Sequence, residues 1–300
     1  MADRRLQVFH AVAKQMSFTK AAETLFMTQP AVTFQIKQLE EHFNTRLFER
    51  GHGRIALTPA GEIVLEYAER ILSLSAELET RLREMTGRLS GPLLIGASTT
   101  IAEFLLPRVL GEFKSLHPEV QPKLVVANSE AIENRVAEHT LDIGLIEAPS
   151  HLPSLLTEMC CEDELQVIVS PQHPLAKAKS VTPKQLVAYP YVSRESGSGT
   201  REFTDLYFRK AGVNPTELSV VMELGSPEAL KGVVETGLGF AILSKATVAK
   251  EQKLGELVAV PLTPKLLRSL SLVYPKEKFR SRLVNTFVEF AQARMKDTVL

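Results

Sequence analysis

The feature that most constrains the fold of this chain is the stretch from residue 17 to residue 54, SFTKAAETLFMTQPAVTFQIKQLEEHFNTRLFERGHGR. Ser17 is a residue type that caps helix N-termini, and small and apolar residues follow it at helical spacing. Thr28 is placed to cap a second helix, and Pro30 falls in its first turn, where a missing N–H group costs nothing. The stretch therefore predicts two short helices that meet at a tight turn, followed by a basic hairpin.

The second of these helices divides into an apolar and a polar face. Val32, Ile36 and Leu39 face inward, whereas several other side chains carry hydroxyl or amide groups. Such groups bond to base edges or phosphates without the desolvation cost of a charge, and Gln pairs well with adenine. We therefore expect this helix to lie in a DNA major groove; the alternative is an ordinary polar helix face. The polar set is Thr28, Gln29, Thr33, Gln35 and Gln38.

Elements on either side complete a small domain. Apolar residues repeat at helical spacing between residues 6 and 13 and predict a helix that packs behind the pair. Asn44 tolerates the left-handed conformation that ends a helix, and residues 47–50 and 55–57 predict two short strands around a glycine turn. The pattern is a winged helix-turn-helix over residues 1–58. Its wing places two basic side chains near phosphates or the minor groove, namely Arg50 and Arg54.

A long helix is predicted after the wing. It restarts at Thr58-Pro59, runs to Gly87 and carries an apolar seam at steps of three and four residues. We expect the seam to pair with a second chain as a coiled-coil-like dimer interface; the alternative is packing on its own domain. Gly91-Pro92 follows as a hinge, which gives a linker over residues 59–90. The seam comprises Val64, Tyr67, Ile71, Leu74, Leu78, Leu82 and Met85.

Beyond the linker, short apolar strands alternate with helices, which predicts an α/β fold with a parallel sheet. Because the closing helix can return to the first half, we expect two subdomains joined by two crossing strands, with a cleft between them. Within residues 91–300, subdomain I spans about 91–164 and 268–300, and subdomain II spans about 165–267. The predicted strands are 93–97, 123–127, 142–146, 165–170, 189–193, 218–222, 240–243 and 266–274, and the predicted helices are 101–116, 130–139, 201–211, 227–236 and 281–295.

Composition narrows the classes of protein that fit. The 300 residues suit two or three domains, and a hydrophobic content of 44% is ample for buried cores. Net charge is zero, but residues 1–60 hold eight Lys or Arg against five acids, a modest excess that a solvated surface explains equally well. No apolar run has the length of a signal peptide or membrane span, so we expect a cytoplasmic protein without a membrane partner. Cys160 and Cys161 offer no disulfide framework and are expected inside a buried strand.

Hydroxyl-bearing residues stand at three predicted helix N-termini, each directly after a strand. In α/β sheets ligands bind at the carboxyl ends of strands, where helix N–H groups favour anions. Taken singly, each cluster is an ordinary helix cap, but three together with two arginines favour a small-anion pocket. The candidate residues are Ser98, Thr99 and Thr100, then Ser129 after Asn128, and finally Arg194, Gly197, Ser198, Gly199, Thr200 and Arg201.

Two acidic residues near strand ends complicate an anion site. Glu147 and Glu223 must each pair with an arginine or hold a proton, because unpaired carboxylates would repel the ligand. The Gly-Ser-Gly-Thr segment lacks the Lys and the spacing of a P-loop. The seven histidines show no metal-ligand spacing, and no Ser lies in a nucleophile elbow. We therefore expect a binding protein rather than an enzyme, with no cofactor and no metal.

Several motifs carry a family likeness. The segments AAETLFMTQPAVTFQIKQLE, LFER and LTPAG resemble the LysR-type transcriptional regulators. The likeness continues through GASTTI, DIGLIE, SGSGTRE, ELGSPEALK and GLGFAILS, which are similar to the effector domain of that family. These later motifs resemble the branch that contains carbon-fixation regulators and the sulfite-responsive YeiE-type regulators. DIGLIEAP and RESGSGTRE favour the second of these.

The resemblance implies an N-terminal winged helix-turn-helix, a linker helix and a periplasmic-binding-protein-like effector domain of two Rossmann-like subdomains. It also implies a dimer of dimers that binds promoter DNA, contacts RNA polymerase and responds to an effector in the cleft, for which sulfite is our hypothesis. A sugar phosphate or nucleotide effector, a solute-binding protein and a regulator without an effector are the alternatives. The DNA contacts carried over are Thr28, Gln29, Pro30, Thr33 and Gln35, with Arg54 on the wing.

One position departs from the family pattern. Position 34, often basic or polar in relatives, is Phe34 in this chain. Its ring either touches a thymine methyl group or packs inside the domain. Operator preference is therefore not carried over from the family.

Overall fold

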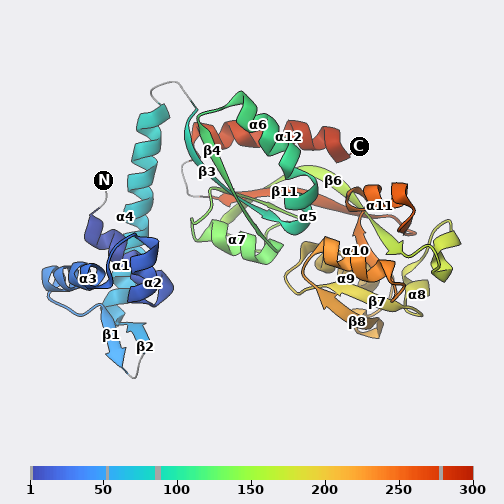
Figure 1. The fold of residues 1–300 in the computed structure, drawn as a ribbon, viewed down its shortest axis with the longest axis horizontal. Coiled ribbons are helices and arrows are strands. Elements are labelled where there is room, and N and C mark those ends of the chain that lie inside the picture. The colour runs from blue at the N-terminus through green and yellow to red at the C-terminus, as the bar shows by residue number, and fades with distance from the viewer. Residues whose placement is uncertain (1–2, 52–53, 85–88, 277–279, 300) are drawn as a thin grey trace. The chain divides into compact units, whose positions relative to one another are not determined.

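The structure, a computed structural model, describes residues 3–51, 54–84, 89–276 and 280–299. The chain forms two compact units, Met1–Arg88 and Leu89–Leu300, and each is described by itself (Figure 1). None of the described helices is long and apolar enough to cross a lipid bilayer.

The first unit contains the predicted helix pair with its predicted caps. The Oγ of Ser17 accepts the Lys20 N–H at 3.2 Å, and the Oγ1 of Thr28 accepts the Ala31 N–H at 3.4 Å. Asn44 ends the second helix of the pair in the left-handed conformation, with φ 50°. The elements are α1 (Arg4–Gln15), α2 (Phe18–Thr24), α3 (Gln29–Phe43), β1 (Phe48–Gly51), β2 (Arg54–Leu57) and α4 (Pro59–Glu84).

Three helices enclose the core of this unit, and the wing closes one end of it. Phe9 of α1, Ile36 of α3 and Leu47 before β1 are fully buried together. The antiparallel strands β1 and β2 pair from Phe48 opposite Leu57 to the turn. Gly61 lets α4 approach closely, because a Cβ atom there would lie 2.1 Å from the carbonyl oxygen of Leu47.

Among the described residues of the first unit, most of the apolar seam of α4 is left exposed. Only its first member, Val64, packs against the core. Met85 lies outside the described residues. The others are exposed by roughly half or more: Tyr67 53%, Ile71 47%, Leu74 64%, Leu78 56% and Leu82 56%.

The second unit is built on a mixed seven-stranded sheet, ordered β10-β6-β11-β5-β3-β4 with β9 also paired to β6. The predicted strands and helices are present, apart from the differences described below. Its first half comprises β3 (Gly91–Ser98), α5 (Thr99–Phe104), α6 (Leu106–Leu116), β4 (Val120–Ala127), α7 (Ser129–Ala137), β5 (Ile143–Ile146) and β6 (Leu155–Val169). The remainder comprises α8 (Pro183–Leu186), β7 (Pro190–Arg194), α9 (Gly199–Lys210), β8 (Ser219–Leu224), α10 (Pro227–Glu235), β9 (Ala241–Ser244), α11 (Ala249–Leu254), β10 (Val258–Val260), β11 (Leu266–Pro275) and α12 (Arg282–Val299).

The chain returns to the first half of this unit as predicted. Phe287 of α12 packs against Phe113 of α6, with ring centroids 5.2 Å apart. These two helices cover one face of the sheet, and α7 covers the other (Figure 1). The second half of this unit has a core of its own, in which Phe208 of α9 and Phe240 before β9 are buried.

Three predictions for this unit were wrong in detail. The helix predicted over residues 101–116 breaks into α5 and α6, because Pro107 has no N–H to donate to the carbonyl of Glu103. The strand predicted at 165–170 begins at Leu155 and is 15 residues long. The sheet is mixed rather than parallel, because β11 runs antiparallel to both β5 and β6. The sequence prediction also missed the short elements α8, α11 and β10.

Strands β6 and β11 are the two predicted crossing strands. They pair from Leu266 opposite Leu165 to Pro275 opposite Leu155, with one register shift after Leu270. Cys160 is the extra residue at this β-bulge. Both cysteines are buried in β6, as predicted.

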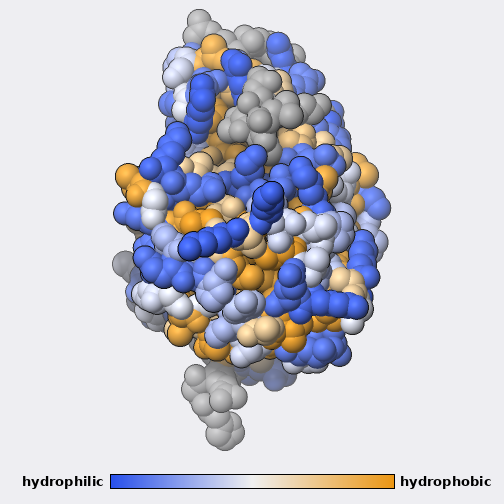
Figure 2. All heavy atoms as spheres, turned by 90° about the vertical axis from the view of Figure 1, so that its right-hand side faces the viewer, coloured by the Kyte–Doolittle hydropathy of each residue, from blue (hydrophilic) through white to orange (hydrophobic). Residues whose placement is uncertain are grey.

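The surface of the second unit is mixed. Figure 2 shows hydrophobic patches scattered among hydrophilic residues on the face that it displays. Val220 and Val221 of the edge strand β8 are 48% and 45% exposed, and Leu254 is 62% exposed. Dispersed apolar side chains of this kind are normal for a protein surface.

Candidate functional site

The outward side of α3 carries the predicted DNA-reading residues. Gln29 and Pro30 are exposed in its first turn, and Nε2 of Gln29 donates a hydrogen bond to Oγ1 of Thr33 at 3.1 Å. The hydroxyl of Thr28 is occupied by the helix cap, and Gln35 lies half-buried on the flank. The structure therefore brings exposed Gln29 into contact with half-buried Thr33.

For the two predicted basic residues of the wing, the structure describes only the backbone. Arg50 pairs with Ile55, and Arg54 pairs with Gly51 across the hairpin. The side chains of Arg50 and Arg54 lie outside the described residues.

Phe34 does not pack into the core. Its side chain is 57% exposed, whereas Val32 and Ile36 beside it are fully buried. Of the two placements that the sequence left open, the structure excludes the interior one.

Glu147 is the centre of the predicted effector site, and it is itself the anion there. It is 1% exposed and lies just beyond β5. Its carboxylate accepts the Ser98 hydroxyl at 3.1 Å and the Thr200 hydroxyl at 2.7 Å. Burial raises its pKa, but the charge of Arg268 and the hydroxyl of Thr100 outweigh burial and lower the pKa to about 2. These three hydroxyls, predicted to hold a ligand, bind Glu147.

Arg268 is the partner that the sequence analysis missed. It lies on β11 with a fully buried side chain, and its Nη1 donates to Glu147 and to Thr200, at 2.7 and 2.8 Å. Its Nε donates to Asp163 of β6 at 2.8 Å, and Asp163 also accepts the Ser244 hydroxyl at 2.5 Å. The signal was present, because Arg268 interrupts the apolar segment LLRSLSLV of a predicted strand, and a buried charge requires a partner.

Arg194 ends β7 and joins the two halves of the effector domain. It is 2% exposed, and its Nη2 donates to Thr99 Oγ1 at 2.9 Å and to the carbonyl of Gly225 at 3.3 Å. Its Nε and Nη2 also bind the carboxylate of Glu195. The buried Nη1 has no hydrogen-bond partner among the residues that the structure describes.

Arg201 is committed to protein partners. Its Nη1 lies 2.5 Å from the Glu223 carboxylate and 3.2 Å from the Arg194 carbonyl, and its Nε lies 4.0 Å from Asp205. Glu147 and Glu223 are therefore both paired with arginines, one of the two states that the sequence analysis required.

The glycine-rich segment lies directly against the first half of the domain. The Gly197 carbonyl accepts the Glu130 N–H at 3.3 Å, in a left-handed conformation with φ +81°. Ser129 accepts the Glu147 N–H at 3.3 Å. A Cβ atom on Gly199 would lie 2.7 Å from that of Glu147, so only glycine permits this approach.

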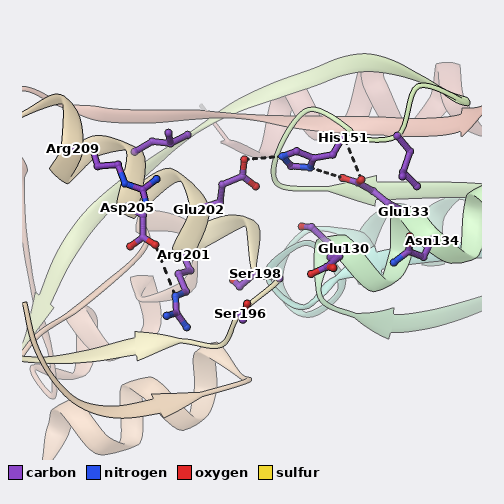
Figure 3. Close-up of a pocket in the computed structure, with 14 residues that line it drawn as sticks. Glu130, Glu133, Asn134, His151, Ser196, Ser198, Arg201, Glu202, Asp205 and Arg209 are labelled. Atoms are coloured by element: carbon purple, nitrogen blue, oxygen red, sulfur yellow. Dashed lines mark hydrogen bonds and ion pairs between the residues drawn. The ribbon is translucent and has the colours of Figure 1, made fainter. Parts of the chain in front are cut away.

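A pocket of about 530 Å³ opens between α7 and α9 (Figure 3). Ser129, Gly197, Ser198 and Arg201 lie in its wall, as do four carboxylates and Arg209. The buried Ser198 hydroxyl has no partner in the described ranges. Because carboxylates outnumber arginines, charge disfavours an oxyanion in this pocket. The carboxylates are those of Glu130, Glu133, Glu202 and Asp205.

His151 bridges the two walls of this pocket (Figure 3). Its Nε2 lies 3.0 Å from Glu202 on α9, and its Nδ1 lies 3.7 Å from Glu133 on α7. Burial lowers the pKa of His151, but the two carboxylates outweigh it and raise the pKa above its usual value. No local pattern in the sequence indicates this bridge, because its members are far apart in the chain.

A helix-turn-helix DNA-binding domain followed by a two-lobed ligand-binding domain defines a ligand-responsive DNA-binding regulator. Residues 4–62 match the bacterial regulatory helix-turn-helix protein, lysR family, and residues 86–296 match the LysR substrate binding domain. The chain belongs to the LysR family. It is a transcriptional regulator and not an enzyme.

Its relatives include regulators of carbon fixation. It is 34% identical to a probable RuBisCO transcriptional regulator of Porphyra purpurea, over 94% of this chain and 90% of the relative. It is 33% identical to a protein of the same description from Synechocystis, over 95% and 84%. These relatives give no support to the preference for sulfite drawn from the motifs, and they favour the carbon-fixation branch instead.

Two solved structures are similar to this chain. The regulatory domain of CcmR from Synechocystis PCC6803, in complex with 2-PG, is 29% identical over 69% of this chain and 99% of that chain, with a TM-score of 0.64. A full-length OxyR variant from Pseudomonas aeruginosa is 21% identical over 98% of this chain and 94% of that chain, with a TM-score of 0.73. At that identity the second match supports the fold alone.

Proposed function

We propose that this LysR-type regulator responds to a small phosphorylated metabolite held by Arg194. The buried Nη1 without a partner carries the proposal, because an unpaired buried donor costs free energy that an acceptor on a ligand would recover. A phosphate accepts charge-assisted hydrogen bonds from a guanidinium in a fixed geometry. The CcmR domain in complex with 2-PG, 2-phosphoglycolate, is the relative that supports this ligand class.

A phosphate at Nη1 would lie beside the Glu195 carboxylate, which Nε and Nη2 of Arg194 already bind. The carbonyl of Gly225, which Arg194 holds, precedes Ser226, and Ser226 begins the nine-residue helix α10 without a side-chain cap. Pro227 has no N–H, so in this proposal the backbone N–H groups after Pro227 bind the phosphate oxygens. Thr99 completes the site from the other half of the domain.

This position allows the ligand to bias the two halves of the domain. A ligand that contacts Arg194 of one half and Thr99 of the other binds best when they lie close together. Differential affinity for two arrangements then shifts their populations. In our proposal the assembly transmits this shift to the bend of promoter DNA or to contact with RNA polymerase.

The assembly is a dimer of dimers paired through the linker helix, residues 59–90. The exposed apolar seam of α4 supports this proposal, because a continuous row of exposed apolar side chains along a helix is typical of a paired helix. Within the same proposal, residues 1–58 bind DNA and residues 91–300 bind the effector, with the subdomain limits given above.

Thermal unfolding in the presence of anions tests the effector. We expect 2-phosphoglycolate at 100 times its Kd to raise Tm by about 5 °C or more. Arg194→Gln should abolish the shift, whereas Arg108→Gln, on an 82% exposed side chain, should keep it. Stabilisation by sulfite but not by 2-phosphoglycolate would return the sulfite hypothesis, and stabilisation by neither would refute a small-anion effector.

The salt dependence of DNA binding tests the helix-turn-helix domain. The DNA contacts that we propose are Thr28, Gln29, Pro30, Thr33, Gln35, Arg50 and Arg54. Gln29→Ala should lose discrimination between operator and random DNA. Arg54→Ala should weaken binding to all sequences and reduce the slope of log K against log salt by about 1. A salt series in which the two variants behave alike argues against this division.

A further inference from the structure

Phe34 occupies the outermost line of α3. Helical residues advance by about 100° each, which places Phe34 roughly opposite the buried stripe of Val32, Ile36 and Leu39. Pro30 and Lys37, one turn before and after it, are also exposed. The ring therefore stands at the middle of the face that points farthest from the core.

The protein's own fold gives this exposed ring no role. Ordinarily a single exposed apolar residue needs no explanation. Here, however, the ring belongs to the helix that we propose to face the bases, about 100° around α3 from Thr33. A helix seated in the major groove brings the side chains of its outermost line nearest to the base edges.

A phenyl ring distinguishes bases in two ways: it disfavours base edges that need a hydrogen bond, and it favours apolar groups. It neither donates nor accepts a hydrogen bond at a guanine, cytosine or adenine edge, so it would leave those groups without water and without a partner. Thymine is the one base that presents a methyl group in the major groove. The preference of the ring is therefore for thymine.

We propose that Phe34 is a specificity-determining residue that packs on thymine methyl groups in each operator half-site. This inference rests on the proposed binding of DNA by α3. It predicts an operator with a T·A pair under the middle of α3, at a position where Gln29 makes no contact.

Substitution of deoxyuridine for thymidine tests the proposal, because it removes the methyl group and leaves the pairing unchanged. The operator is first selected from random DNA with the full-length protein. Each thymine of a half-site is then replaced in turn, and binding is measured by fluorescence anisotropy at fixed salt. The wild-type protein should bind about fourfold more weakly for each contacted methyl group removed.

Two variants separate this contact from a general loss. Phe34→Ala should bind thymine and deoxyuridine operators equally, and Phe34→Leu should keep part of the difference. Phe43→Ala removes another exposed ring, 46% exposed at the far end of α3, and should keep the full wild-type difference. Thermal unfolding of each variant identifies any that fails to fold.

The outcomes are distinguishable. Failure to select any operator would contradict the proposed function. A selected operator at which no deoxyuridine weakens wild-type binding, or at which Phe34→Ala still senses the methyl group, would overturn the role of Phe34 and leave DNA binding by α3 intact.

Discussion

Glu147 holds an ionised carboxylate where water does not reach, and its partners come from distant parts of the chain. Ser98 ends β3, Thr200 lies on α9 and Arg268 lies on β11. A buried charge of this kind persists only with a cation and hydrogen bonds around it. The carboxylate thereby fills the place that the sequence had assigned to an oxyanion.

Glu147→Gln should destabilise the protein by about 3 kcal/mol, because Arg268 loses one of its two buried carboxylate partners. Urea unfolding at pH 7 measures this difference. Glu112→Gln is the control, since its partners Arg108 and Arg294 are 82% and 50% exposed and each such pair contributes under about 1 kcal/mol. Equal losses in the two variants would contradict a special role for the buried pair.

The same residue predicts a pH dependence. The pKa of Glu147 is lowered from 4.5 to about 2 on folding. Its contribution is therefore complete above pH 4.5 and is lost as the pH falls towards 2. The unfolding free energy of Glu147→Gln should accordingly fall less steeply over this range than that of the wild type.

Residue types near strand ends were recognisable in the sequence, but their partners were not. Hydroxyls at 98, 100 and 200 follow local rules of strand and helix order. Their bonds to Glu147 form around its buried pair with Arg268, which is 121 residues from Glu147. A local sequence pattern cannot indicate a partner so far away in the chain. Of the two arginines predicted to bind the effector, Arg194 is buried and Arg201 is paired with Glu223.

At the scale of elements, prediction was accurate wherever a local rule sets the boundary. Ser17, Thr28 and Asn44 act at the positions expected, because capping depends on a few neighbouring residues. Strand β6 was missed over half its length. Its first ten residues, LLTEMCCEDE, contain five polar residues, and pairing with β11 rather than local pattern holds them in the sheet.

The α4 seam should control self-association. Leu74→Glu combined with Leu78→Glu places charges in the proposed dimer interface and removes apolar burial. The dimer dissociation constant should rise at least a hundredfold, because burying each leucine contributes about 1.5–3 kcal/mol. Sedimentation equilibrium measures this, with Arg70→Glu on the same helix as the control. Unchanged association in the double variant would favour a seam covered by other means.

At the scale of the whole effector domain, His151 links its halves through Glu133 and Glu202. Its folded pKa is raised, so the bridge stabilises the protein below the unfolded pKa near 6.5 and is lost as the pH rises through the folded value. Because the side chain is 64% exposed, the effect is under about 1 kcal/mol.

Substitution of His151 tests this link. The Tm difference between wild type and His151→Gln should be larger at pH 6 than at pH 8. Burial lowers the pKa of His173, so the Tm difference between wild type and His173→Gln should instead grow as the pH rises. A His151 difference that does not change with pH would show that the imidazole packs there without carrying charge.

The two connections between the halves are strands hydrogen-bonded to each other along most of their length. Because the two strands are hydrogen-bonded to each other, one half of the domain can move against the other only by deforming this paired ribbon. At the bulge the ribbon carries an extra residue, Cys160, and a bulge increases the local twist of a strand pair. A ligand that draws the two halves together would therefore do so by deforming this ribbon. In our proposal that deformation is the movement that the assembly transmits to the DNA-binding domains.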